Sequence, residues 1–181
     1  MMPAAAVAAN LEQLHVVPEG PRILLTCGED DARAFAGRLP SGIDRATALF
    51  LDAHDAEVLT GAGDLGAAVD ALAEKVPTIV VTRGSQPAAA ILQGERLETP
   101  AFETGPAVDT TGDRDLLCAA YAWADLRGAD PPTCLAWARL YSQLAMTVPT
   151  ATAGAVTEER LLEEGTARGL VPPPSVERAT A

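Results

Sequence analysis

The stretch Asp109-Thr110-Thr111-Gly112-Asp113-Arg114-Asp115 is a polar turn containing one glycine, and it leads directly into the apolar segment 116–126. The apolar segment has helical character, so the turn is expected to open a helix. The first turn of a helix leaves backbone N–H groups without intrahelical partners, and these groups form an anion site. An aspartate at the same place can accept a proton from a bound hydroxyl. The stretch therefore suggests phosphoryl transfer. The presence of Asp113 and Arg114 inside the turn indicates that this transfer would not be efficient.

Outward from this turn, short apolar runs alternate with helical segments. This alternation predicts an α/β fold with a mostly parallel sheet flanked by helices. The pattern places one domain over residues 1–171 and a disordered, proline-rich tail at 172–181. Strands are expected at 22–27, 46–51 and 78–82, a hairpin around Gly94-Glu95, and helices at 4–17, 29–38, 53–60, 65–75, 114–127, 132–147 and 157–168.

Composition narrows the class of protein. The chain has 181 residues, 48% of them hydrophobic, which is typical of a globular protein with a real core. Its net charge of −12 disfavours nucleic acid as a partner, because an acidic surface repels phosphate backbones. Two histidines exclude a multi-histidine metal centre, and three widely spaced cysteines are expected to be reduced thiols of a cytoplasmic protein. No window is apolar and long enough to predict a membrane span.

Four landmarks then follow one another in a fixed order. An acidic stretch at 52–61 ends in Leu-Thr-Gly, the run Val80-Val81-Thr82-Arg83-Gly84 follows, and a hairpin ends in Pro100-Ala101-Phe102. Val108-Asp109-Thr110-Thr111-Gly112 then precedes two helical segments. In this order the landmarks resemble the C-terminal half of PfkB/ribokinase-like carbohydrate kinases, over roughly residues 22–165.

The resemblance implies roles for the residues of the turn. In that family the turn usually continues Gly-Ala-Gly-Asp, its amides form an anion hole for the transferred phosphoryl group, and the last Asp is the catalytic base. Here the resemblance makes Asp115 the base and assigns the anion hole to Thr111, Gly112, Asp113 and Arg114. The Asp113 and Arg114 side chains crowd a place where bare backbone usually approaches phosphate. The alternative is that Asp113 and Asp115 only stabilise a helix N-terminus.

The same resemblance implies ATP and Mg²⁺ as cofactors. Asp52 and Asp55 stand where the family has an Asn-x-x-Glu motif that organises Mg²⁺, and their oxygens suit a hard cation. An ordinary acidic helix start is the alternative. Thr82, Gly84 and Arg139 occupy positions that line the family's nucleotide site, and Arg139 stands where an asparagine is common.

Length separates the chain from the family, whose members are roughly twice as long. The resemblance implies that the lid, the first strands and most sugar contacts are missing. One sheet edge would then be open unless residues 4–17, a second copy in a homodimer, or another partner covered it. Two functions remain: ATP-dependent phosphorylation of a hydroxyl on a sugar or similar small alcohol, with nucleotide and sugar as partners, or an inactive, truncated kinase-like remnant that acts as a binding or interaction module.

Overall fold

The computed structural model describes residues 20, 22–83, 86–98, 102–149 and 151–174. The chain forms two compact units, residues 1–98 and 99–181, which are described separately below. The helix expected at 4–17 lies outside the described residues. A single domain over 1–171 and a disordered tail from 172 stay predictions.

Unit 1 is built on a five-stranded sheet in the order β1-β2-β3-β4-β5. The strands β1, β2 and β3 are parallel, and β3, β4 and β5 continue the sheet as antiparallel neighbours. The hairpin between β4 and β5 turns at Gln93 and Gly94, both with positive φ. The predicted α/β class and the predicted hairpin are therefore confirmed. The strands are β1 Leu24–Thr26, β2 Ala48–Asp52, β3 Thr78–Arg83, β4 Gln86–Leu92 and β5 Glu95–Glu98.

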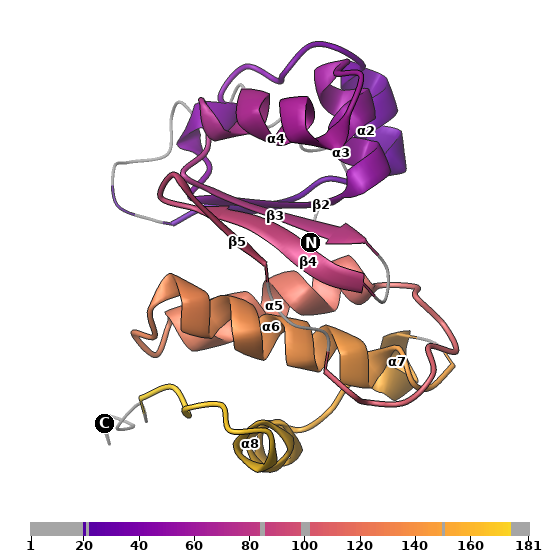
Figure 1. The fold of residues 1–181 in the computed structure, drawn as a ribbon, viewed down its shortest axis with the longest axis vertical. Helices are drawn as coiled ribbons and strands as arrows, with labels where there is room; N and C mark the ends of the chain where they lie inside the picture. Colours follow the sequence, from indigo (N-terminus) through magenta and orange to yellow (C-terminus); the bar gives the residue numbers. More distant parts are fainter. Residues whose placement is uncertain (1–19, 21, 84–85, 99–101, 150, 175–181) are drawn as a thin grey trace. The chain divides into compact units, whose positions relative to one another are not determined.

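Three helices, α2 Glu29–Phe35, α3 Ala53–Thr60 and α4 Leu65–Ala73, lie on one face of this sheet (Figure 1). A short 3-10 turn, η1 Ile43–Arg45, precedes β2. Apolar residues from the helices and from alternate strand positions form one buried cluster that includes Leu49, Leu51 and Ile79. Asp64 caps α4, the helix expected at 65–75, by accepting a hydrogen bond from the Ala67 N–H at 2.9 Å. Gly61 ends α3 with a φ of 71°.

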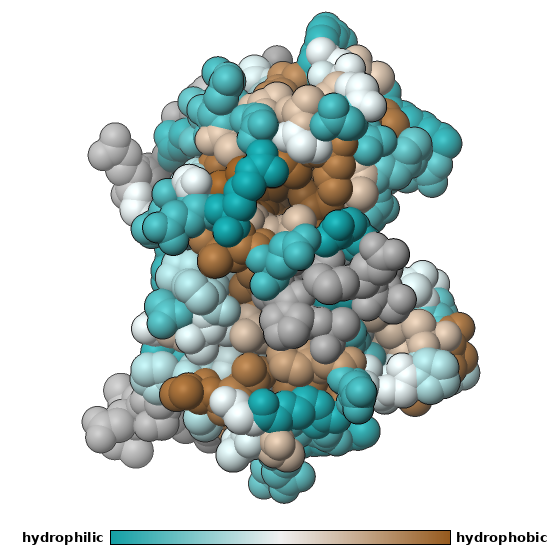
Figure 2. All heavy atoms as spheres, viewed as in Figure 1, coloured by the Kyte–Doolittle hydropathy of each residue, from teal (hydrophilic) through white to brown (hydrophobic). Residues whose placement is uncertain are grey.

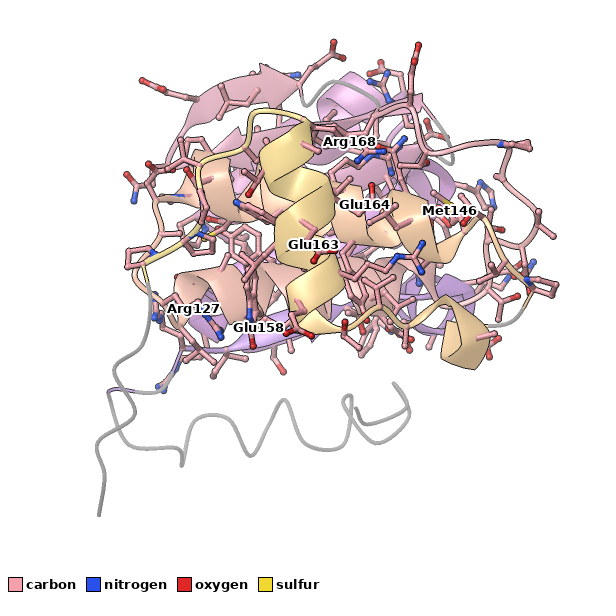
Figure 3. All side chains as sticks on the ribbon, turned by 90° about the horizontal axis from the view of Figure 1, so that it is seen from below. Arg127, Met146, Glu158, Glu163, Glu164 and Arg168 are labelled. Carbon is pink, nitrogen blue, oxygen red and sulfur yellow. The ribbon has the colours of Figure 1, made fainter. Side chains whose placement is uncertain are left out.

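Unit 2 contains the helices α5 Asp113–Asp125, α6 Pro131–Ala145, α7 Ala151–Gly154 and α8 Glu158–Ala167. The short α7 was not predicted. Asp130 caps α6 by accepting from the Thr133 N–H at 2.7 Å, and two prolines fill the first positions, where a missing N–H costs little. Ion pairs secure α8 at both ends: Arg127 binds Glu158 at 2.6 Å, and Arg168 binds Glu164 within the helix (Figure 3). None of the helices in the described part of the chain combines the length and apolarity that crossing a membrane requires.

Two tryptophans organise the packing of unit 2. Trp123 on α5 and Trp137 on α6 meet edge to face, with ring centroids 5.7 Å apart. The Trp137 Nε1–H donates to the Val171 carbonyl at 2.8 Å, which fastens the segment after α8. A Cβ atom added at Gly165 of α8 would come within 2.2 Å of the Trp137 ring, so α8 can approach α6 only with glycine at this position.

We expect Gly165→Ala to destabilise the protein by about 1–3 kcal/mol or more, because the added methyl overlaps a buried ring that has no room to move. Helix propensity alone would favour alanine over glycine by up to about 1 kcal/mol. A decrease in the free energy of unfolding can therefore be attributed to the packing contact. Urea unfolding followed by tryptophan fluorescence measures it. Gly63→Ala is the control, because its added Cβ meets nothing within 4 Å. A stabilised Gly165→Ala protein would contradict this packing.

Candidate nucleotide and phosphate site

In unit 1, three of the predicted site residues lie at the carboxyl ends of neighbouring parallel strands. Asp52 ends β2, and it stands opposite Thr82 of β3 in the strand register. Asp55 follows in the first turn of α3. The carboxyl ends of parallel strands are where open α/β sheets place their ligands. Gly84, the remaining predicted nucleotide contact of this unit, lies outside the described residues.

Asp52 caps α3, and its Oδ1 accepts a hydrogen bond from the Asp55 N–H at 2.8 Å. This cap is what an ordinary acidic helix start requires. Asp55 itself is only 1% exposed, which is unusual for a carboxylate. The two side chains supply oxygen ligands, and Mg²⁺ commonly takes one or two protein carboxylates and completes its shell with water and phosphate oxygens. The donor chemistry therefore fits Mg²⁺, although no group of three His, Cys, Asp or Glu able to hold a metal ion occurs among the described residues.

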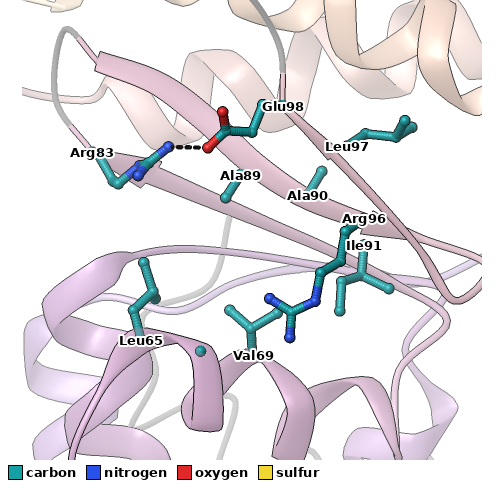
Figure 4. Close-up of a pocket in the computed structure, with 10 residues that line it drawn as sticks. Leu65, Val69, Arg83, Ala89, Ala90, Ile91, Arg96, Leu97 and Glu98 are labelled. Carbon is teal, nitrogen blue, oxygen red and sulfur yellow. Dashed lines mark hydrogen bonds and ion pairs between the residues drawn. The ribbon is translucent and has the colours of Figure 1, made fainter.

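A cavity of about 270 Å³ also lies in unit 1, between α4 and the β4–β5 hairpin (Figure 4). Its walls are mainly apolar, and the space-filling view shows apolar atoms gathered in a hollow of this unit (Figure 2). Arg83 and Arg96 line it, and each pairs with a carboxylate of the chain, Glu98 and Asp70 respectively. Its lining includes none of the predicted site residues.

In unit 2, the turn before α5 is held in place by the end of α6. The backbone N–H groups of Val108 and Asp109 both donate to the Met146 carbonyl, at 2.8 and 3.3 Å. Upstream, the Phe102 N–H donates to Oε1 of Gln143 on α6 at 2.8 Å. Sequence analysis missed Gln143 and Met146 because a polar side chain and a carbonyl at a helix end carry no motif.

Three of the backbone amides that the family resemblance assigns to the anion hole already donate hydrogen bonds within the turn. The Thr111 N–H donates to Asp109 Oδ1 at 2.9 Å, and the Asp113 N–H donates to the Thr110 carbonyl at 3.2 Å. The Arg114 N–H donates to Asp113 Oδ1 at 2.6 Å. Gly112 adopts a left-handed conformation with a φ of 80°, so Asp113 becomes the first residue of α5. The chain's own oxygens therefore occupy donors that a phosphoryl group would need.

Arg139 lies in the middle of α6 and is 0% exposed. Burial lowers the pKa of its guanidinium, and the negative charge of Asp113 acts in the opposite direction and raises it. The charge of Asp113 on α5 therefore acts on Arg139 of α6. Among the predicted site residues of unit 2, Arg139 is the most deeply buried.

Asp115, the predicted base, is the third residue of α5 and is half-buried. Its charge is felt by Cys118, one helical turn further along. Burial raises the pKa of the Cys118 thiol from 9.0 to about 11, and the Asp115 carboxylate adds to the rise. The structure thus places Thr111, Gly112, Asp113, Arg114, Asp115 and Arg139 in unit 2 and Asp52, Asp55 and Thr82 in unit 1.

A mixed α/β sheet, an acidic strand end and a glycine turn that opens a helix are features of the ribokinase-like fold. The model of the pfkB family of carbohydrate kinases matches residues 5–158, and the chain belongs to this family. A nucleoside kinase of Methanocaldococcus jannaschii is 24% identical over 139 residues, which are 69% of this chain and 45% of that protein.

Solved structures share the fold. The Methanocaldococcus jannaschii nucleoside kinase has a TM-score of 0.75 at 20% identity, covering 87% of this chain and 52% of its own. A Burkholderia thailandensis nucleoside kinase with ADP-inosine has a TM-score of 0.79 at 22% identity, over 98% and 55%. Arabidopsis thaliana ribokinase with ribose and ATP has a TM-score of 0.73 at 23% identity, over 86% and 51%. The chain spans about half the length of these relatives.

The charge of Asp115 predicts how Cys118 reacts. With its pKa at about 11 instead of 9.0, the thiol holds roughly 100-fold less thiolate at pH 8, so alkylation by iodoacetamide is slow and accelerates as the pH rises toward 11. Asp115→Asn lowers the pKa and speeds alkylation at pH 8 by less than this factor, because burial remains the larger cause. Peptide mass spectrometry follows Cys118 separately from Cys27 and Cys134. Asp125→Asn, at the far end of α5, should leave the rate unchanged. An alkylation rate in Asp115→Asn equal to that of the natural chain would contradict the effect of the Asp115 charge on Cys118.

Proposed function

We propose that this chain carries the nucleotide- and phosphoryl-handling part of an ATP-dependent kinase that phosphorylates a hydroxyl of a sugar or similar small alcohol. The observation that carries the proposal is Asp115, an accessible carboxylate in the first turn of α5, directly after a left-handed glycine. Membership of the pfkB family supports the reaction class. Relatives solved with ribose and ATP or with ADP-inosine support ATP as donor and a sugar hydroxyl as acceptor.

In this reaction Asp115 accepts the proton of the acceptor hydroxyl. The acceptor oxygen forms a bond to the γ-phosphorus of ATP, the bond from that phosphorus to the β–γ bridging oxygen breaks, and ADP leaves with the electron pair. Most of the rate comes from positioning and from neutralising the charge on the transferred group. The backbone amides from Thr111 to Arg114 and the Arg114 side chain would stabilise that charge.

The remaining predicted residues would bind the donor. Asp52 and Asp55 would hold Mg²⁺, which neutralises phosphate charge when bound. Thr82, Gly84 and Arg139 would contact the nucleotide. We also propose a cytoplasmic location, consistent with three free cysteines, and a homodimer or partner that covers the β1 edge of the sheet. Within the described residues, β1 pairs only with β2.

A second candidate function is a catalytically inactive binding or interaction module. The hydrogen bonds within the turn favour it, because the Thr111, Asp113 and Arg114 amides already have acceptors in the chain. Calorimetry with Mg-ATP separates the two candidates when it is combined with turnover. Binding of Mg-ATP without release of ADP would support the binding module. If the chain neither binds Mg-ATP nor releases ADP, a role for the nucleotide would be excluded for both candidate functions.

Removal of the base is the direct test of the kinase. We expect Asp115→Asn to lower kcat for ADP release by roughly 100-fold or more with ribose or inosine as acceptor, because general-base catalysis typically contributes about 10²–10⁴. The KM for ATP should change little, since Asp115 acts on the acceptor. A coupled ADP assay measures both constants.

Glu163→Gln is the matched control, because it removes one exposed carboxylate from α8 of the same unit (Figure 3). It should keep the activity of the natural chain. Equal turnover of Asp115→Asn and the natural chain would exclude Asp115 as the base.

A further inference from the structure

We propose that the cavity between α4 and the β4–β5 hairpin binds a small carboxylate that carries an apolar body, such as one aromatic ring on a short chain (Figure 4). Arg96 binds the carboxylate of this ligand, and the apolar walls of the cavity hold its body. The site goes beyond the proposed function, because it lies within unit 1 and its lining includes none of the residues assigned to the nucleotide and phosphate site.

The cavity follows from the way the strands are connected. Parallel strands need crossover connections, and the crossovers between β1, β2 and β3 supply the helices α2, α3 and α4. The antiparallel strands β4 and β5 are joined by a tight turn instead, so the hairpin brings no helix of its own. The face of the hairpin beside α4 is therefore only partly covered, and a cavity of about 270 Å³ remains there.

The walls of the cavity are mainly apolar and come from two elements. Leu65 and Val69 belong to α4, and Ala89 and Ile91 belong to β4. An apolar cavity of about 150 Å³ is sufficient to hold benzene. The larger space here can therefore hold one ring with a short chain attached. Removal of the ring from water favours its binding.

A guanidinium stands at this apolar surface. Arg96 of β5 lies directly opposite Ile91 in the strand register, so the two side chains share one face of the sheet. In Figure 4 the Arg96 guanidinium lies between the hairpin and Val69 of α4. Arg83 also lines the cavity, where it pairs with Glu98 at 2.8 Å. The whole chain has only 13 Lys and Arg against 25 Asp and Glu, so two arginines at one cavity are a local feature that suits an anionic ligand.

The present partner of Arg96 shows which chemistry its guanidinium accepts. Arg96 forms an ion pair with the carboxylate of Asp70, and both side chains are more than half exposed, by 58% and 67%. Exposed ion pairs contribute little to stability, so a ligand carboxylate can replace Asp70 at small cost. The planar guanidinium can bind that carboxylate through two parallel hydrogen bonds. A ligand that also places a ring in the cavity gains apolar contacts that the short Asp70 side chain lacks.

Hydrocinnamate, a benzene ring with a two-carbon chain and a carboxylate, is the probe. A titration of the full chain is followed by the NMR methyl resonances of Leu65, Val69 and Ile91. We expect these resonances to shift together, with a dissociation constant of about 1 mM or lower for a ligand of this size. The uncharged amide of the probe should bind roughly tenfold more weakly, because it loses the charge-assisted hydrogen bonds. No saturable shift at these three residues at about ten times that concentration would overturn the site.

Two substitutions with opposite expected effects test the role of Arg96. Arg96→Gln removes the guanidinium and should weaken the binding of hydrocinnamate roughly tenfold. Asp70→Asn removes the competing carboxylate and should strengthen binding roughly twofold to fivefold. Arg33→Gln is the matched control, because Arg33 is an exposed arginine of the same unit that pairs with Glu29 within α2, and its loss should leave the affinity unchanged. Equal affinity of Arg96→Gln and the natural chain would overturn the assignment.

Filling the cavity distinguishes binding inside it from binding to an arginine on the surface. Ala89 is half-buried in the wall, so Ala89→Leu reduces the space and leaves every charged group in place. We expect this variant to bind hydrocinnamate roughly tenfold more weakly, because the ring loses its apolar contacts. An unchanged affinity would mean that the ligand does not enter the cavity, and the proposal would be wrong.

Discussion

The backbone N–H groups at the start of α5 have no acceptor within the helix. The site is arranged around the oxygens that accept hydrogen bonds from these groups and from the turn before them. Asp109, Thr110 and Asp113 each supply one accepting oxygen. A kinase of this family needs such amides for a phosphoryl group, whereas a stable helix needs them satisfied. Both requirements concern the same few amides. In this chain, nearby oxygens of the chain itself accept their hydrogen bonds, which satisfies the helix.

The charge of Arg139 extends this constraint into the helix pair. A guanidinium with no exposure needs an anion nearby, and Asp113 provides a negative charge that partly offsets the effect of its burial on its pKa. Taken separately in the sequence, Asp113 and Arg139 look like two independent departures from the family pattern. In the structure the negative charge of Asp113 raises the pKa of Arg139, so the two departures are electrostatically linked.

Local rules were sufficient to predict most elements of the fold. Gly61 ends α3 and Asp64 caps α4 because the chemistry of a helix end is set within a few residues. The hairpin followed from the glycine between two short runs. The electrostatic effect of Asp113 on Arg139 links α5 and α6, and the close approach of Gly165 to Trp137 joins α8 to α6. Such contacts depend on packing between distant segments, so no local pattern in the sequence could show them.

Several hydrogen bonds that do not involve the Asp113 side chain fix the path of the turn. The bonds from Val108 and Asp109 to Met146, the contact of Phe102 with Gln143, and the left-handed Gly112 fix the path of the backbone. None of them involves the carboxylate of Asp113. The turn can therefore keep its path while the side chain at position 113 departs from the family pattern.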